Sequence, residues 1–411
     1  MDVKMMARQL VKMAVQNVLL PLVYRFKKPS QIEKGLVVFA DAHHDRVPPS
    51  MRPLVREIKR RGNLRVVQIY DDYQQLSFLK LFYRMMHFMH YYVKAEYVVI
   101  CDNFLPVASC HKRKETTVIQ LWHGCGAFKK FGYDTPGDIP AFYKGNVFRN
   151  SDLVTVSAPG CVPHFQSAMR LPQTVFQPVG VCRTDKFFSK KYCQTCKEFF
   201  ERKHPQARGK KVVLWAPTFR GYPADPQLEQ YEDIVAMAQE LPDDVFVVIK
   251  VHPLLAKKYP YDNSSMTTDQ LLPVTDLLIT DYSSIIFEYS IFRKPMLFYA
   301  PDREEYDVAR GFYLDYDKLP GKIVTEPERL AQEVLQVLSE SGEGTVRTDM
   351  SAESSEKAVH TDMSAERGKV IRQRKTAAGG KDAQAVQAFY EAYMSGCDGK
   401  VTKRLADRMG A

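Results

Sequence analysis

Short apolar runs alternate with longer amphipathic segments along the first half of the chain. The runs are rich in Val and Ile and almost continuously apolar, which is typical of strands covered on both faces. They predict strands at residues 35–40, 64–70, 96–101, 117–122 and 153–157, with helices at 48–62 and 77–92. This alternation predicts a parallel sheet with helices on both faces.

The same alternation restarts near residue 211, after a basic and polar stretch at 190–210 that is expected to be a linker. Further strands are expected at 211–215, 245–251, 276–280 and 295–299, and helices at 226–241 and 283–292. The predicted fold class is therefore α/β, with two facing Rossmann-like, doubly wound domains at residues 34–189 and 211–337. Such sheets bind ligands at the carboxyl ends of their strands.

Three segments lie outside these domains. Residues 1–28 carry six Lys or Arg against one acid, among Met, Val and Leu. We expect residues 1–33 to form a basic amphipathic helix that either lies on an anionic membrane or packs a Met-rich face into the core. Residues 338–382 contain TDMSAE twice and almost no large apolar residue, which predicts a disordered polar insert. Residues 383–411 regain helical periodicity and are expected to pack back on the body.

The composition limits which classes of partner and cofactor are expected. The 411 residues include 58 basic and 48 acidic ones, and the net charge of +10 favours anionic partners. Eight scattered cysteines indicate reduced, buried thiols, and the single CxxC at Cys193 and Cys196 lacks the second pair that a zinc site needs. No apolar run reaches the roughly 18 residues that cross a bilayer. We expect no metal, no cofactor and no nucleic-acid partner.

Polar residues stand where several predicted strands end. His123 follows TVIQLW and precedes Gly124, and a histidine there is either a loop cap or a base at the mouth of a cleft. In ITDYSS, the residues Asp281, Ser283 and Ser284 stand between a buried strand and a helix. Hydroxyls beside a helix start suit a phosphate, although a plain N-cap has the same sequence.

Other candidates are weaker alone. His252 follows a strand and precedes Pro253, as structural loop residues also do. Thr218 and Arg220 follow VVLWAP and are able to donate to an anion, the alternative for Arg220 being a salt bridge. Lys129 and Lys130 suit an acceptor that carries phosphate, or are a solvated pair. The sequence DAHHDR at 41–46 fits no metal motif and is expected to be a solvent loop at the cleft rim.

Taken together, these motifs resemble the CDP-glycerol glycerophosphotransferase family of teichoic-acid synthesis. The resemblance covers residues 95–335 and rests on LWHG (121–124), KKFG (129–132), WAPTFR (215–220), KVHP (250–253), TDYSSIIFEY (280–289), KPMLFY (294–299) and RGFYLDY (310–316). DGKVTKRLADRM at 398–409 resembles the closing segment of the family. The chain departs from the family pattern at Cys125, where a hydroxyl residue is usual, and at Glu288, where Asp is usual.

The resemblance implies a GT-B-like fold and an enzyme on the cytoplasmic face of the cell membrane. It implies transfer of polyol phosphate, with glycerol phosphate expected, from CDP-glycerol or CDP-ribitol to a hydroxyl of a lipid-linked acceptor, with release of CMP. His123 resembles the catalytic base. Residues that resemble donor contacts are Thr218, Arg220, His252, Asp281, Ser283, Ser284, Arg310 and Gly311.

Two other functions remain open from sequence. A sugar-nucleotide glycosyltransferase of the same fold would share the two domains and the phosphate site. A basic protein that binds nucleic acid or anionic lipid would need no histidines at strand ends. Its basic residues would gather on one face, whereas those of this chain are spread along its length and match no nucleic-acid motif.

Overall fold

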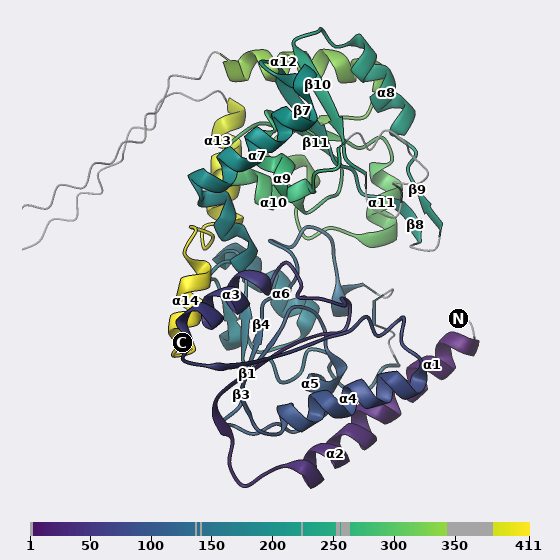
Figure 1. Ribbon diagram of the computed structural model, residues 1–411. Coiled ribbons are helices and arrows are strands. Elements are labelled where there is room, and N and C mark those ends of the chain that lie inside the picture. Colours follow the sequence, from purple (N-terminus) through teal and green to yellow (C-terminus); the bar gives the residue numbers. More distant parts are fainter. Residues whose placement is uncertain are drawn as a thin grey trace, which may run out of the picture.

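The computed structural model describes residues 3–135, 138–139, 142–222, 225–251, 255, 264–342 and 381–411. Within these ranges the chain forms a six-stranded and a five-stranded sheet, both parallel throughout, in two bodies that lie one above the other (Figure 1). Helices cover both faces of each sheet. This confirms the predicted α/β class and the parallel sheets.

The first sheet has the order β2-β1-β3-β4-β5-β6. Its strands are β1 (Glu33–Asp41), β2 (Arg65–Tyr70), β3 (Ala95–Ile100), β4 (Thr117–Gln120), β5 (Leu153–Thr155) and β6 (Phe176–Gln177). Alternate β1 residues face opposite ways: Val38 packs with α2 (Leu20–Lys27), α4 (Phe78–Tyr92) and α5 (Leu105–Ser109), and Phe39 packs with α3 (Arg52–Arg61) and α14 (Val401–Arg408). Burial on both faces explains why the strand sequences are apolar throughout. Helix α6 (Val162–Met169) covers the end of the sheet at β5 and β6.

The second sheet has the order β10-β7-β11-β12-β13. Its strands are β7 (Lys211–Trp215), β10 (Val245–Ile249), β11 (Leu277–Thr280), β12 (Met296–Tyr299) and β13 (Gly321–Val324). One face packs on α7 (Lys190–Lys203), α10 (Ile285–Ser290) and α13 (Lys381–Tyr393), and the other on α8 (Tyr231–Glu240) and α12 (Leu330–Gly342). Two short helices, α9 (Thr268–Leu271) and α11 (Arg303–Arg310), lie in its loops.

Several elements differ from the sequence prediction. The stretch expected as a linker forms α7, in which Cys196 is buried and Phe200 packs into the core of the second sheet. The helix expected from residue 226 begins at Tyr231, because Asp225–Gln227 is strand β9 and pairs with β8 (Arg220–Tyr222). Strands β6 and β13 escaped prediction, since β6 has two residues and the GKIV of β13 holds only two large apolar ones.

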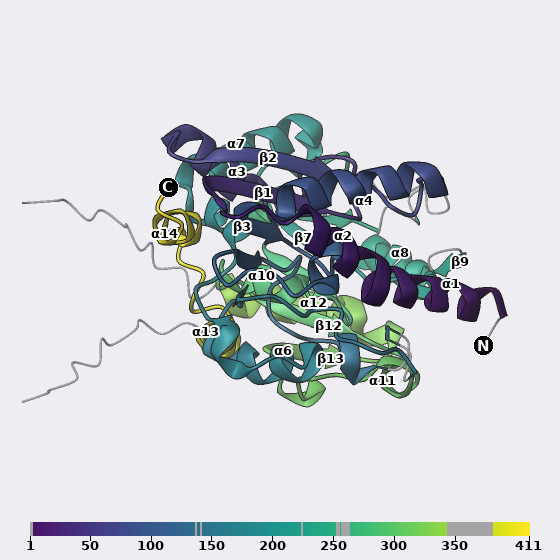
Figure 2. The same ribbon diagram turned by 90° about the horizontal axis from the view of Figure 1, so that it is seen from below.

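The chain ends lie on opposite sides of the molecule (Figures 1 and 2). At the start, α1 (Val3–Ala14), a π-helical turn (Val15–Leu19) and α2 form one continuous helix. Of the expected polar insert, 338–342 complete α12, 381–382 begin α13, and the rest lies outside the described residues. Helix α14 returns to the first domain, where Arg61 binds Asp407 at 2.7 Å. All eight cysteines are free and seven are buried, as expected.

Candidate active site

His123 follows β4 at the carboxyl end of the first sheet. After the strand ends at Gln120, Trp122 adopts a left-handed backbone with φ of +57°, which is uncommon for a residue with a side chain. The buried Trp122 ring lies 4.4 Å from the His123 ring. The imidazole itself stays open to solvent, with 54% of the side chain exposed.

Asp102, which follows β3, holds the His123 ring. Its Oδ2 lies 3.1 Å from His123 Nδ1. Burial acts to raise the pKa of Asp102, but the hydrogen bond and charge of His123, together with the charge of His43 and the backbone N–H of Asn103, keep the pKa below its usual value. When Nδ1 donates to this carboxylate, Nε2 carries the lone pair that is able to take a proton. Sequence reasoning missed Asp102, although a carboxylate directly after the buried strand YVVIC is the same kind of signal as His123.

Residues 123–132, which we call the crossing segment, run from His123 to the second domain. A Cβ at Gly126 would lie 2.3 Å from the ring of Phe287 in α10, so glycine is required at this contact. Further along, Lys129 pairs with Phe312 in an antiparallel bridge, and Phe128 is buried in the core of the second domain. The candidate base is therefore a few residues from a fixed contact between the domains.

Lys129 and Lys130 lie on this crossing segment, against the second domain. Lys129 Nζ lies 5.9 Å from the centre of the Tyr306 ring, and the Lys130 side chain runs beside Gly311. Burial lowers the pKa of Lys129 to about 8, opposed by the charge of Asp281. The acceptor role expected for the two lysines stays a prediction, and the observed contacts of both side chains are with residues of the second domain.

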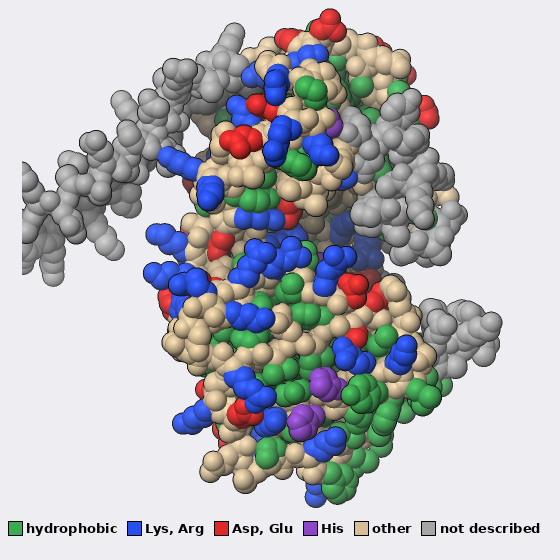
Figure 3. Space-filling view, viewed as in Figure 1, with side chains coloured by type: hydrophobic (Ala, Val, Ile, Leu, Met, Phe, Trp, Pro, Cys, Tyr) green, Lys and Arg blue, Asp and Glu red, His purple; other side chains and the backbone are tan. Residues whose placement is uncertain are grey.

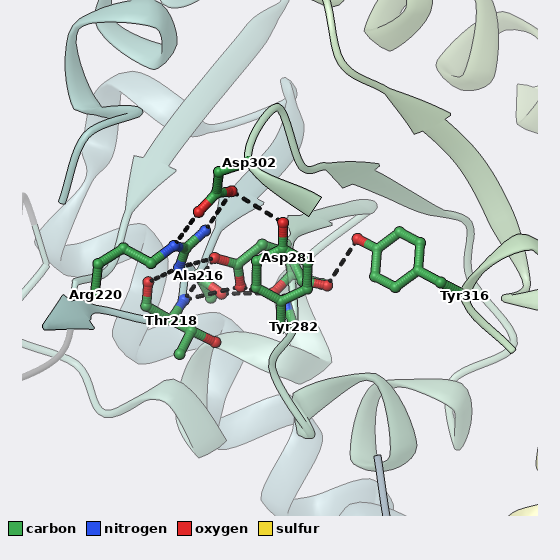
Figure 4. Close-up of polar contacts among 8 residues, drawn as sticks. Ala216, Thr218, Arg220, Asp281, Tyr282, Asp302 and Tyr316 are labelled. Carbon is green, nitrogen blue, oxygen red and sulfur yellow. Dashed lines mark hydrogen bonds and ion pairs between the residues drawn. The ribbon is translucent and has the colours of Figure 1, made fainter. Parts of the chain in front are cut away.

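Asp281 joins the loops that follow β7 and β11 (Figure 4). Its carboxylate accepts hydrogen bonds from the backbone N–H of Thr218 at 2.9 and 3.1 Å, and from Arg220 Nη1 at 2.8 Å. Arg220 also donates to Asp302, which in turn accepts from the Tyr282 hydroxyl at 2.9 Å. Asp281 is thus a buried hub that fixes two loops at the sheet edge.

Arg220 is fully engaged in this network. Its side chain is 10% exposed, and although burial acts to lower the pKa of Arg220, the carboxylates of Asp302 and Asp281 raise it. The guanidinium also stacks on the rings of Tyr282 and Tyr306. A direct donor contact by Thr218 or Arg220 stays a prediction, whereas their observed contacts position the loops around the pocket described next.

A pocket of about 460 Å³ opens at the carboxyl ends of β7, β10 and β11. Ser283 and Ser284 line it beside Pro217, Lys250 and Thr267. The expected helix start contributes little, because α10 has only six residues. Hydroxyls and a lysine ammonium are nevertheless the groups that bind phosphate oxygens. Ser283 and Ser284 thus line a pocket at the strand ends, and their role as donor contacts stays a prediction.

Arg183 and the buried Glu288 form an ion pair that also lines this pocket. Arg183 lies in a 3₁₀ turn (Cys182–Phe188) that leads out of the first domain, whereas Glu288 lies on α10 of the second. The pair therefore links the domains at the pocket wall. No sequence pattern connects these positions, and Arg183 was missed.

The remaining candidates are divided. Arg310 forms an ion pair with Asp138 of the first domain at 3.2 Å, and Gly311, with φ of +76°, ends α11 beside Lys130. Both therefore lie where the domains meet. His252 lies outside the described residues. Within the described part of the chain, no group of three or more His, Cys, Asp or Glu is arranged to hold a metal ion.

The sequence matches a family model described as CDP-Glycerol:Poly(glycerophosphate) glycerophosphotransferase over residues 22–362. A teichoic acid ribitol-phosphate primase from Bacillus spizizenii is 30% identical over 92% of this chain and 91% of its own length. The teichoic acid ribitol-phosphate polymerase TarL of Staphylococcus aureus is 36% identical over 56% of this chain, which spans 44% of that protein.

Among solved structures, the wall teichoic acid polymerase TagF superposes with a TM-score of 0.68 at 20% identity. The superposition covers all of this chain and 98% of that chain. At this identity the likeness concerns the fold.

Proposed function

The chain belongs to the CDP-glycerol:poly(glycerophosphate) glycerophosphotransferase family, and from this premise we propose that it transfers a polyol phosphate from a CDP-activated donor to a hydroxyl of a teichoic-acid acceptor. One observation carries the assignment of roles. The His123–Asp102 pair stands at the carboxyl edge of one sheet, and the crossing segment joins it to the helix that lines the pocket of the other. We further propose a GT-B-like arrangement, with the acceptor on the first domain and the donor on the second.

In the proposed reaction, Nε2 of His123 takes the proton of the acceptor hydroxyl. The hydroxyl oxygen attacks the donor phosphorus that bears the polyol. The bond from this phosphorus to the bridging oxygen breaks, and CMP leaves with the electron pair. Ser283, Ser284 and Lys129 would bind the charged oxygens of the diphosphate. Positioned hydrogen-bond donors that stabilise charge in the transition state are usually the largest contribution to such catalysis.

The transferred unit is tested with purified protein and a lipid-linked teichoic-acid acceptor. CDP-ribitol and CDP-glycerol are compared, because the relative matched over most of both chains is a ribitol-phosphate primase whereas glycerol phosphate was expected from sequence. Formation of CMP together with an acceptor enlarged by polyol phosphate is the expected result. Transfer from a nucleotide sugar, without turnover of either CDP-polyol, would favour the rival glycosyltransferase function instead.

Lys129 gives the reaction a pH dependence. Burial lowers its pKa to about 8, so the ammonium is lost as pH rises from 7 to 9 in the free enzyme. We expect kcat/KM for the CDP-polyol to fall over this range, because kcat/KM reports groups of the free enzyme. Lys129→Met should lower kcat/KM at pH 7 and remove the inflection, whereas Lys130→Met should keep it. An inflection near pH 8 that persists in Lys129→Met would contradict this role.

We also propose that the first domain rests on the cytoplasmic face of the membrane through α1, α2 and α4. Nine of the thirteen exposed large apolar side chains in the described part of the chain belong to these helices or to the π-helical turn between α1 and α2. They are Leu10, Val11, Val18, Leu22, Phe26, Phe78, Leu79, Phe82 and Tyr83. Figure 3 shows hydrophobic side chains gathered with Lys and Arg at the lower right, where Figure 1 places these helices.

This surface, here called the α2/α4 face, combines apolar and basic groups. Arg25, Lys27 and Lys80 are exposed on these helices, and the exposed Lys28 directly follows α2. Apolar side chains that enter the headgroup region together with cations that meet anionic lipid are the two requirements of interfacial binding. No described helix combines the length and apolar character needed to cross a bilayer.

Replacing Phe26, Phe78 and Leu79 together by Ser should weaken binding to phosphatidylglycerol vesicles by more than about tenfold. The reason is that burial of one Phe or Leu side chain contributes about 1.5–3 kcal/mol. Val308→Ser on α11 is the matched control, since Val308 is 91% exposed but lies on the second domain. Sedimentation with vesicles measures the effect. Unchanged binding of the triple variant, or an equal loss in the control, would exclude this face.

A further inference from the structure

The first sheet has a ligand position that the proposed function leaves empty. Its chain order reverses between β1 and β3, because β1 is followed by β2 on one side and β3 pairs on the other. In doubly wound sheets, ligands bind at such a switch point, beyond the carboxyl ends of the two strands. In the second sheet the equivalent point lies between β7 and β11, where the donor pocket opens.

His43 and Asp102 occupy this switch point. Nε2 of His43 lies 3.9 Å from Asp102 Oδ2, the same oxygen that lies 3.1 Å from His123 Nδ1. The two imidazole nitrogens are therefore no further apart than the sum of these distances. Both rings are open to solvent, with 37% of the His43 side chain exposed.

A buried carboxylate fixes the loop that carries His43. Asp41, at the end of β1, accepts from the backbone N–H of His43 at 2.8 Å and from Cys101 Sγ at 3.3 Å. It also pairs with His44 Nδ1 at 2.8 Å. The sequence predicted a solvent loop at the cleft rim, and the rim position fits. The contacts of Asp41 add that His43 has a set position beside the candidate base.

We propose that His43 binds the acceptor, by donating a hydrogen bond from its imidazole Nδ1 to the phosphodiester next to the reacting hydroxyl. The inference rests on the proposed function, which supplies an acceptor with hydroxyl and phosphodiester groups side by side. Within the described residues, Nδ1 of His43 has no hydrogen-bond partner while Nε2 faces Asp102. The acceptor would thus be held by His43 while His123 takes its proton.

The test compares His43→Gln with His44→Gln. His44 is the matched control because it lies on the same loop and is similarly exposed, but it pairs with Asp41 and does not contact Asp102. We expect His43→Gln to raise KM for an acceptor ending in polyol phosphate by about tenfold, the value of one charge-assisted hydrogen bond. KM for the CDP-polyol, kcat at saturating acceptor and the melting temperature should stay unchanged. His44→Gln should change none of these.

A second acceptor identifies the group that His43 contacts. When the terminal phosphodiester is converted to an uncharged methyl phosphotriester, wild type should lose about tenfold in kcat/KM and His43→Gln should lose nothing further. An equal loss in both proteins, or an unchanged acceptor KM in His43→Gln, would overturn the inference while leaving the proposed function intact. Failure of wild type to transfer from either CDP-polyol would instead overturn the proposed function.

Discussion

Replacing His123 by Gln is expected to lower kcat for polyol-phosphate transfer by about 10²–10⁴-fold, the usual contribution of a positioned general base. Glutamine keeps much of the side-chain volume and a group that is able to face Asp102, but it has no nitrogen that takes up a proton near neutral pH. Because the side chain is 54% exposed, the fold should tolerate the change. Rates of CMP release, with thermal unfolding as a check on folding, measure the effect.

Two further variants test whether the loss is specific to His123 and how much of it depends on Asp102. His111→Gln replaces an exposed histidine before β4, at the opposite edge of the same sheet, and should leave kcat unchanged. Asp102→Asn removes the carboxylate that orients the His123 ring but leaves the base itself in place, so its loss should be smaller than that of His123→Gln. Full activity in His123→Gln would reject the assigned role, and a loss in His111→Gln would show that the effect is not specific to the strand edge.

Most strands of both sheets could be predicted from the sequence because each of these strands is an apolar run. Val37 and Val38 face opposite sides of the first sheet and both are buried, so the strand reads as an unbroken apolar run. Polar residues directly after such runs marked the sheet edges, and His123, Asp281 and Ser283 lie there. Elements whose residues make few core contacts, such as the two-residue β6, left no comparable pattern.

The contacts that turn these edges into a site were not accessible, because they join distant positions. Nothing local connects Arg183 with Glu288, or indicates that Gly126 lies against Phe287. Lys129 illustrates the same limit. Its neighbours in sequence suggested the acceptor side, but the crossing segment carries it to Tyr306 in the second domain. The motifs therefore indicated candidate residues at the strand ends, but the domain that each side chain contacts depends on tertiary packing.

Asp281→Ala is expected to destabilise the second domain by about 3 kcal/mol, towards the lower end of the cost of breaking a buried ion pair because Arg220 keeps Asp302 as a partner. The change leaves the guanidinium of Arg220, 10% exposed, short of one carboxylate and removes the acceptor of the Thr218 N–H. Urea unfolding followed by circular dichroism measures the loss. Since Asp281 also fixes the loops around the pocket, affinity for the CDP-polyol should fall in parallel.

Asp317→Ala is the matched control for this loss. Asp317 likewise forms an ion pair with an arginine, Arg303, but its side chain is 67% exposed against 3% for Asp281. Water replaces the partner of an exposed arginine, so the unfolding midpoint should stay at the wild-type value. Asp281→Asn should lie between the two, because Asn retains an acceptor for the Thr218 N–H and loses only the charge. If all three variants unfold at the same urea concentration, the Asp281 network does not stabilise the pocket. The loops after β7 and β11 would then have to be held by their strands alone.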